Sequence, residues 1–275
     1  MTVSASAASS ASAASASAGS PRMLIAPDSF KEALAASDAA EAMARGVRRV
    51  LPEAQIDLCP LGDGGEGTLA ALLAAASEAD PIEARSAQVR DPLGREVTAQ
   101  WGWQPGSRTA IVELAEASGL HLVSPDERDA RVADTHGVGE LILAALDAGA
   151  ERLIVTLGGS ATNDGGSGML RALGLRLLDA DGNELPAGGA ALARLASLDV
   201  TALDPRLANL KVSAAVDVDN PLCGPRGASA VFGPQKGADA AVVEELDAAL
   251  GHFARLSAEV LGADQQQLAD AGAAG

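Results

Sequence analysis

Aromatic side chains and cysteines are scarce in this sequence. Aromatic residues make up 2% of the 275 residues and hydrophobic residues 48%, so alanine and aliphatic side chains must fill the core of a globular protein. The two cysteines, Cys59 and Cys223, are too few for a disulfide framework and lack a metal-ligand spacing. This scarcity favours a reducing, cytoplasmic environment.

Basic residues and histidines are also few. Twenty Lys and Arg face 37 Asp and Glu, which gives a formal net charge of -17. Such a charge repels nucleic acids and anionic membranes and argues for a soluble protein. If the ligand is anionic, a few individual lysines must create a local positive pocket for it. The three histidines, His121, His136 and His252, lie too far apart in sequence to form a metal pattern.

No apolar run is long enough to span a membrane. Residues 2–19 are almost entirely Ala and Ser, and they lack the charge and the apolar core of a secretory signal. We therefore expect residues 1–22 to form a disordered tail. A transit peptide is the alternative, but Arg22 is the only basic residue before Lys31, which disfavours it.

The most informative stretch is residues 158–168, with five glycines directly after the apolar run 153–157. Glycines let the backbone turn tightly, approach a ligand closely and leave N–H groups free for an anion. A helix predicted from about residue 166 would place its N-terminal dipole beside a phosphate. A plain linker is the alternative, although linkers are usually shorter. The candidate ligand-binding residues are Gly158, Gly159, Ser160, Thr162, Asn163 and Asp164.

A second glycine-rich loop, residues 62–68, lies between a predicted strand over 55–61 and a predicted helix over 69–76. Its Asp63 is suited to hold Mg²⁺ or a substrate hydroxyl, whereas the alternative interpretation makes it a turn residue and Thr68 a helix N-cap. The candidate phosphate-binding residues of this loop are Gly64, Gly65 and Thr68.

Further polar groups follow predicted strands, and open α/β sheets bind ligands at the carboxyl ends of their strands. The alternatives are turn-forming aspartates, a capping box that begins at Ser29 and lysines in solvent. The candidates are Asp28, Ser29 and Lys31 after a predicted buried strand over 23–27, Asp217 and Asn220 after a strand over 212–216, and Lys236 just before a helix over about 239–261.

The order of these elements predicts a two-domain α/β fold with mostly parallel sheets and with ligands in the cleft between the domains. Residues 23–80 would belong to a Rossmann-like first domain. Residues 81–262 would form a second α/β domain that starts with antiparallel strands over about 82–89, 97–103 and 109–113. Trp101 and Trp103 share one strand face, which favours core packing over base stacking.

Several motifs are missing. No glycine stretch fits the Walker A pattern or the dinucleotide-binding pattern G-x-G-x-x-G, and no G-x-S-x-G elbow occurs. Glycine loops, aspartates and isolated lysines remain. This set suits phosphoryl transfer, which needs oriented N–H groups and cations for the phosphates and carboxylates for Mg²⁺ and the attacking hydroxyl.

Five motifs in order also resemble the bacterial glycerate kinases of the first type: residues 27–31, 63–68, 158–166, 217–222 and 232–237. The resemblance covers residues 23–275. It implies transfer of the ATP γ-phosphate to D-glycerate with Mg²⁺, which gives 2-phosphoglycerate or 3-phosphoglycerate, in a cleft between two α/β domains. The family's motif positions fall on Lys31, Asp63, Ser160, Asn163, Asp164, Asp217, Asn220 and Lys236.

From their chemistry we expect Asp164 to act as the general base, Asp63 and Asp217 to lie on the magnesium side, and Lys31 and Lys236 to pair with phosphate or carboxylate. Exchanging the roles of Asp164 and Asp217 fits the sequence equally well. Family members continue past a loop that residues 263–275 begin, and the later segment completes the first domain. We therefore expect residues 263–275 to form a truncated return loop.

Two other functions fit the same residues. One is a Mg²⁺-dependent phosphatase that uses Asp63 or Asp217. The other is an inactive chain that binds glycerate or nucleotide, or that pairs with another subunit. A homodimer is compatible with the sequence, and neither a nucleic acid nor a membrane partner is expected.

Overall fold

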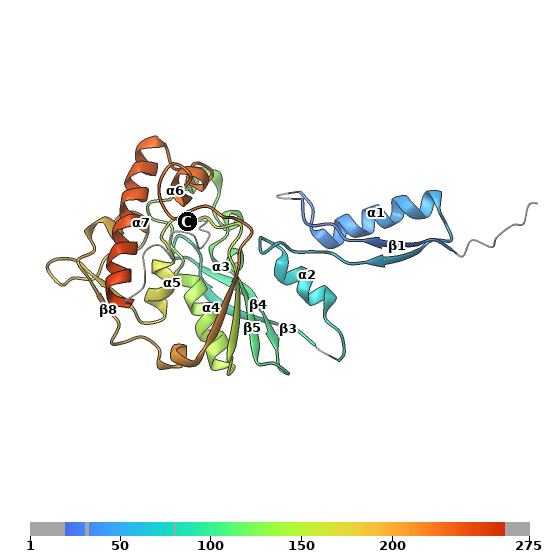
Figure 1. Ribbon diagram of the computed structural model, residues 1–275, viewed down its shortest axis with the longest axis horizontal. Coiled ribbons are helices and arrows are strands. Elements are labelled where there is room, and N and C mark those ends of the chain that lie inside the picture. The colour runs from blue at the N-terminus through green and yellow to red at the C-terminus, as the bar shows by residue number, and fades with distance from the viewer. Residues whose placement is uncertain (1–19, 31–32, 80, 262–275) are drawn as a thin grey trace, which may run out of the picture.

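The computed structural model describes residues 20–30, 33–79 and 81–261 (Figure 1). It has a mixed α/β architecture, with a small β1–α1–β2 unit set apart from a larger body and α2 lying between them. The predicted disordered tail over residues 1–22 lies almost entirely outside the described residues, as does the return loop over residues 263–275.

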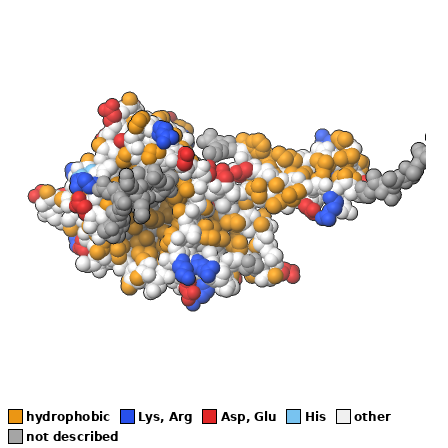
Figure 2. Space-filling view, viewed as in Figure 1, with side chains coloured by type: hydrophobic (Ala, Val, Ile, Leu, Met, Phe, Trp, Pro, Cys, Tyr) orange, Lys and Arg blue, Asp and Glu red, His pale blue; other side chains and the backbone are white. Residues whose placement is uncertain are grey.

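The small unit is a parallel pair of strands with one helix. Strands β1 (Arg22–Ile25) and β2 (Gln55–Leu58) pair directly in parallel, and α1 (Ala36–Val50) lies between them in the sequence. Ala40 and Ala44 of α1 pack on Ile25, because alanines at helical spacing let the helix approach the sheet closely. The helix covers only one face. Leu24, which points to the other face, is 69% exposed, so the prediction of a buried first strand is wrong for this residue. Hydrophobic side chains are visible over this unit in Figure 2.

The larger body is built on a five-stranded sheet with the order β3-β4-β5-β6-β9. Short turns join β3, β4 and β5, which makes these three strands antiparallel as predicted, whereas β5, β6 and β9 run parallel. The sheet is therefore mixed, which confirms the predicted α/β fold with some antiparallel strands in its larger part. The strands are β3 (Glu83–Arg90), β4 (Glu96–Gln104), β5 (Thr109–Glu113), β6 (Arg152–Thr156) and β9 (Lys211–Ala215).

The core lies between this sheet and its helices. Trp101 and Trp103 are buried there, as predicted, with their rings edge to face at a centroid distance of 6.2 Å. Leu141 and Ile142 of α4 pack into the same cluster, whereas Leu250 of α7 packs into a second one. The remaining α-helices are α2 (Thr68–Ala75), α3 (Ala115–Ser118), α4 (His136–Asp147), α5 (Ser167–Ala172), α6 (Ala228–Phe232) and α7 (Ala240–Leu261).

Short elements complete the body. Strands β7 (Arg176–Leu178) and β8 (Ser197–Asp199) form an antiparallel pair beside α7. The 3₁₀ turns are η1 (Leu120–Leu122), η2 (Pro125–Glu127), η3 (Gly189–Arg194), η4 (Pro205–Asn209) and η5 (Pro234–Lys236). Within the described ranges, no helix has both the length and the apolar character needed to cross a bilayer.

The parallel strands bring polar loops to one edge of the sheet. Glu113, Thr156 and Ala215 end their strands in register with one another. The segments that follow β6 and β9 therefore leave the sheet side by side, as expected for the carboxyl ends of parallel strands.

Candidate functional site

The two glycine-rich loops meet at this edge of the sheet. The Gly158 backbone N–H donates to the Gly64 carbonyl at 3.1 Å, and the Leu157 N–H donates to the Ala215 carbonyl at 3.3 Å. The loop after β2, the loop after β6 and the end of β9 are thus joined by backbone hydrogen bonds. The sequence predicted each loop, and the structure brings them together.

Glycine is required where these loops touch. A Cβ atom on Gly158 would overlap the Cα atom of Gly65. Gly64 has a φ of +94°, and a Cβ atom there would lie 3.0 Å from the Ala215 carbonyl oxygen. A side chain at either position would push the loops apart.

A buried carboxylate holds the start of α2. Glu113, at the end of β5, accepts hydrogen bonds from the Gly67 N–H and the Leu69 N–H, both at 2.8 Å. Burial raises the pKa of Glu113. Its carboxylate occupies the helix N-terminus that a phosphate would otherwise use. The sequence analysis missed Glu113, although an acidic residue closing the otherwise apolar strand 109–113 was a usable signal.

The Asp164 carboxylate holds the start of α5 in the same way as Glu113 holds the start of α2. Its carboxylate is fully buried and accepts from the backbone N–H groups of Gly166 (3.2 Å) and Gly168 (2.9 Å). It also accepts from the N–H and the hydroxyl of Thr135, at 3.0 and 2.8 Å. Asp164 is therefore a helix cap that ties α5 to the start of α4. Thr135 is a second residue that the sequence analysis missed.

Lys236 fastens the loop after β6 from the other side. Its side chain is 1% exposed, and Nζ donates to Ser160 Oγ at 2.7 Å and to the Thr162 carbonyl at 2.6 Å. Burial lowers the pKa of Lys236 to about 7, and the Asp164 carboxylate opposes that shift. The sequence predicted either a phosphate contact or a solvent-exposed lysine. In the structure, Lys236 is buried against the glycine loop over residues 158–168.

The loop retains polar groups without protein partners. The backbone N–H groups of Gly159 and Ser160 donate no hydrogen bond to another described residue. Thr162 Oγ1 and Asn163 Oδ1 are buried and also lack a hydrogen-bond partner among the described residues, whereas the Asn163 amide donates to Ser229 Oγ at 2.9 Å. Buried polar groups are normally satisfied, so such a cluster is typical of a site that binds water or a ligand.

The loop over residues 62–68 is partly used by its own turn. Asp63 is exposed, and its carboxylate accepts from the Gly65 N–H at 2.8 Å. The hydroxyl of Thr68 is buried and accepts from the Gly64 N–H at 3.0 Å. These bonds match the turn interpretation of the sequence, and they leave the other oxygen of Asp63 without a hydrogen bond to a described residue.

Asp217 and Asn220 follow β9 close to the joined loops. Asp217 is exposed and two residues beyond Ala215, which contacts Gly64. The Asn220 side chain donates to the Arg226 carbonyl at 2.8 Å. Within the described ranges, no group of three or more His, Cys, Asp or Glu side chains is arranged to hold a metal ion.

The candidates after β1 are placed only in part. The Asp28 carboxylate accepts from the Ser29 N–H at 2.6 Å, and both residues are half-buried. Lys31 lies outside the described residues, so its predicted role stays a prediction.

Comparisons with known proteins show which family the chain belongs to. Residues 23–275 match the family model described as the glycerate kinase family. The chain is 53% identical over 256 residues to a glycerate kinase of Bacillus subtilis (strain 168) and 48% identical over 254 residues to glycerate 2-kinase of Escherichia coli (strain K12). Each alignment covers 92% of this chain but 65% and 66% of those relatives, so the chain spans slightly less than two thirds of their length.

A solved structure agrees with the fold. The crystal structure of a Salmonella typhimurium LT2 protein named for glycerate kinase 2 superposes with a TM-score of 0.79 at 48% sequence identity. The superposition covers 93% of this chain and 67% of that chain.

Proposed function

The chain belongs to the glycerate kinase family, and from that premise we propose that it transfers the γ-phosphoryl group of ATP to D-glycerate with Mg²⁺. One observation carries the proposal beyond family membership. The two glycine loops and Lys236 meet at one edge of the sheet and leave backbone N–H groups and buried polar atoms without protein partners. Phosphoryl transfer depends mainly on such positioning and charge.

In this proposal the phosphate lies on the loop after β6. The free N–H groups of Gly159 and Ser160 donate to its oxygens, with the Ser160 hydroxyl beside them. Lys236 supplies positive charge from beneath the loop. A phosphate favours the charged ammonium and so raises the lysine pKa above its value in the free protein.

The step forms a bond between a glycerate hydroxyl oxygen and the γ-phosphorus and breaks the bond from that phosphorus to the bridging oxygen, so that ADP leaves. The hydroxyl proton passes to a carboxylate. Asp217 suits this role better than Asp164, because Asp217 is exposed whereas Asp164 is buried and accepts several hydrogen bonds as a helix cap. We therefore assign Asp164 as a positioning residue.

Asp63 is the proposed magnesium-side carboxylate, and Asp217 is its alternative if another group accepts the proton. They flank the contact between Gly64 and Ala215, and Mg²⁺ in kinases is typically held by one or two carboxylates together with substrate phosphates. Their chemistry therefore fits an ion that is held jointly with ATP, and such an ion neutralises charge on the phosphates. The remaining proposed contacts with substrate or phosphate are Asp28, Ser29, Lys31, Gly64, Gly65, Gly158, Thr68, Thr162, Asn163 and Asn220.

The decisive experiment measures ADP released by the 275-residue chain from ATP, Mg²⁺ and D-glycerate. Lys236→Met tests the site, and Lys211→Met, at an exposed lysine that starts β9, is the matched control. We expect D-glycerate-dependent ADP release that the first variant loses and the second keeps. ³¹P NMR of the product then distinguishes 2-phosphoglycerate from 3-phosphoglycerate.

Two results would contradict the kinase proposal. Phosphate release from phosphoglycerate without ATP would indicate a phosphatase. A ligand-induced rise in melting temperature without turnover would indicate a chain that binds but does not catalyse, because binding to the folded state alone raises stability.

A further inference from the structure

A cavity of about 400 Å³ is lined by residues outside the two glycine loops. The turn between β3 and β4, the start of α4, the end of α5 and residues 186–187 form its walls. Its charged or titratable lining residues are Arg90, Asp134, His136 and Arg171. None of the lining residues belongs to the loops over 62–68 or 158–168, so this cavity shares no residue with the proposed phosphate site, although Asp134 packs against Gly168.

The lining is rich in positive charge for so acidic a protein. Arg171 is half-buried and forms no ion pair with a described residue. The Arg90 guanidinium donates to His136 Nε2 at 3.1 Å and lies 3.6 Å from a Glu140 carboxylate oxygen. An arginine can only donate, so His136 accepts as a neutral ring. Burial is the main cause that lowers the pKa of His136, followed by the Arg90 charge.

One polar atom in the cavity wall lacks a partner. Asp134 is 6% exposed, and its Oδ1 accepts from the His136 N–H at 2.9 Å, which caps α4. Its other oxygen accepts no hydrogen bond from a described residue. This oxygen reaches the solvent in the cavity, so it is free to accept a hydrogen bond from a donor that enters. The same cavity lining thus holds one free acceptor and two guanidinium groups.

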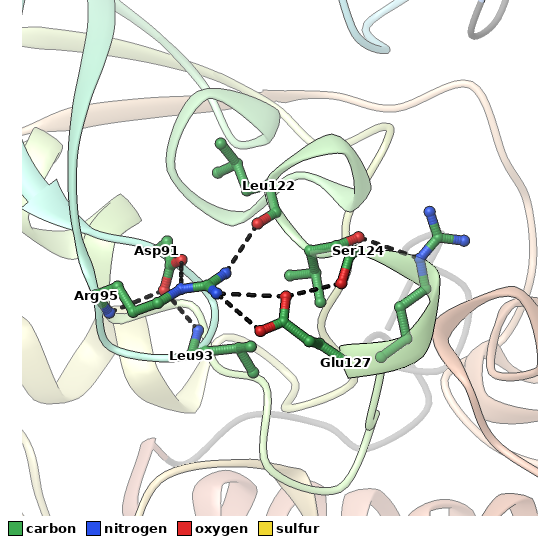
Figure 3. A network of polar contacts seen from close by, with 8 residues as sticks. Asp91, Leu93, Arg95, Leu122, Ser124 and Glu127 are labelled. Atoms are coloured by element: carbon green, nitrogen blue, oxygen red, sulfur yellow. Dashed lines mark hydrogen bonds and ion pairs between the residues drawn. The ribbon is translucent and has the colours of Figure 1, made fainter.

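A network of polar contacts holds the turn between β3 and β4, which forms one wall of the cavity (Figure 3). Asp91 accepts from the backbone N–H groups of Leu93 and Arg95 at 2.8 and 2.9 Å, and from the Arg95 side chain at 2.6 Å. Arg95 also donates to Glu127 and to the Leu122 carbonyl. The Asp134 N–H donates to the Pro92 carbonyl at 3.1 Å, so the network reaches the cavity itself. A site fixed in advance loses little entropy on binding.

We propose that this cavity binds a small polyol phosphate, with its phosphate on the Arg171 and Arg90 guanidinium groups and a hydroxyl donating to Asp134. Arginine forks suit phosphate oxygens, and a carboxylate oxygen accepts from a hydroxyl, so the cavity lining offers partners for both groups of such a ligand. The proposal does not rest on the kinase function, since it uses none of the residues assigned to that reaction.

Isothermal titration calorimetry on the full 275-residue chain tests it with glycerol 3-phosphate, inorganic phosphate and glycerol. We expect glycerol 3-phosphate to bind more tightly than phosphate, and glycerol not to bind. Arg171→Gln should weaken glycerol 3-phosphate binding about 10-fold or more, because it removes a charge-assisted hydrogen bond. Arg152→Gln is the matched control, since Arg152 is exposed at the start of β6, beyond the other end of α4.

A second variant, Ala187→Glu, tests the same cavity in case Arg171→Gln fails to fold. Ala187 is exposed and lines the cavity, so a carboxylate there should abolish binding, whereas Ala187→Gln should preserve it. Equal affinity in wild type, Arg171→Gln and Ala187→Glu would overturn the proposal, as would no binding to wild type. The proposal would also be overturned if D-glycerate bound more tightly than glycerol 3-phosphate and Ala187→Glu abolished that binding. The ligand class would then be a hydroxycarboxylate instead of a polyol phosphate.

Discussion

Lys236 Nζ lies 2.7 Å from Ser160 Oγ, so a buried lysine just before α7 is bonded to the glycine loop that follows β6. The same ammonium donates to the Thr162 carbonyl. This link gives one side chain two tasks, because it fixes the shape of the loop and also places positive charge beneath it. The first two predictions separate these tasks.

Lys236→Met should lower kcat for D-glycerate phosphorylation by about 10²-fold or more, since the transition state loses a positively charged group. Lys236→Arg should not rescue the activity, because a planar guanidinium does not fit the space of a compact ammonium that is 1% exposed. The measurement is steady-state ADP release at saturating ATP. A kcat within a few-fold of wild type in Lys236→Met would remove Lys236 from the mechanism.

Lys236 should also make the free protein more stable as the pH rises. Its folded-state pKa is about 7, below that of a lysine in the unfolded chain, so the unfolded state binds the extra proton between about pH 7 and pH 10. Within this window the free energy of unfolding of wild type, relative to Lys236→Met, should increase with pH by up to about 1.4 kcal/mol per pH unit. Urea unfolding of both proteins at several pH values measures the slope. A flat difference would show that Lys236 keeps an ordinary pKa.

Most elements could be predicted from local patterns. The apolar run over 153–157 became β6 (Arg152–Thr156), and the helical spacing from 239 became α7 (Ala240–Leu261). Such patterns depend on which residues a helix or strand buries, and this information is local. The exposure of Leu24 was not predictable in this way, because it depends on which elements cover each face of β1.

The site was predicted as a set of loops but not as a set of contacts. Glycine content marked residues 62–68 and 158–168 as turns, yet the caps of the two following helices come from Glu113 and from the Asp164–Thr135 pair. Glu113 lies 46 residues from Gly67, and Thr135 lies 29 residues from Asp164. Only the order of strands in the sheet brings such pairs together, and no local pattern encodes that order.

Gly158→Ala should destabilise the protein and reduce activity. The added Cβ atom would overlap the Gly65 Cα atom, and forced overpacking of this kind typically costs about 1–3 kcal/mol. Gly106→Ala is the control, because a Cβ atom there meets nothing within 4 Å. Chemical denaturation and the ADP assay report both effects. Equal stability of the two variants would mean that the loops move apart without cost.

Glu113→Gln should destabilise the start of α2. The amide keeps one acceptor but turns an NH₂ group toward a backbone N–H, so one buried donor loses its partner at a cost of about 1–3 kcal/mol. Glu151→Gln, at an exposed carboxylate paired with Arg108, should cost less than about 1 kcal/mol. Hydrogen exchange at the Gly67 and Leu69 amides localises the effect. Unchanged protection of both amides in Glu113→Gln would contradict the capping role.

Asp164→Asn and Asp217→Asn should have opposite profiles. Asp164 is fully buried and accepts from Thr135, Gly166 and Gly168, so its amide variant should lose about 1–3 kcal/mol of stability. Asp217 is exposed, so its variant should melt like wild type while kcat falls about 10²-fold, as expected for a proton acceptor or magnesium ligand. Melting temperature and kcat, measured on the same preparations, distinguish the two roles. The contrary result is an Asp164→Asn variant that melts like wild type and has a lower kcat than Asp217→Asn. A residue that only positions others cannot lower kcat without disturbing the structure that it holds. That result would therefore make Asp164 the base and its helix-capping role secondary.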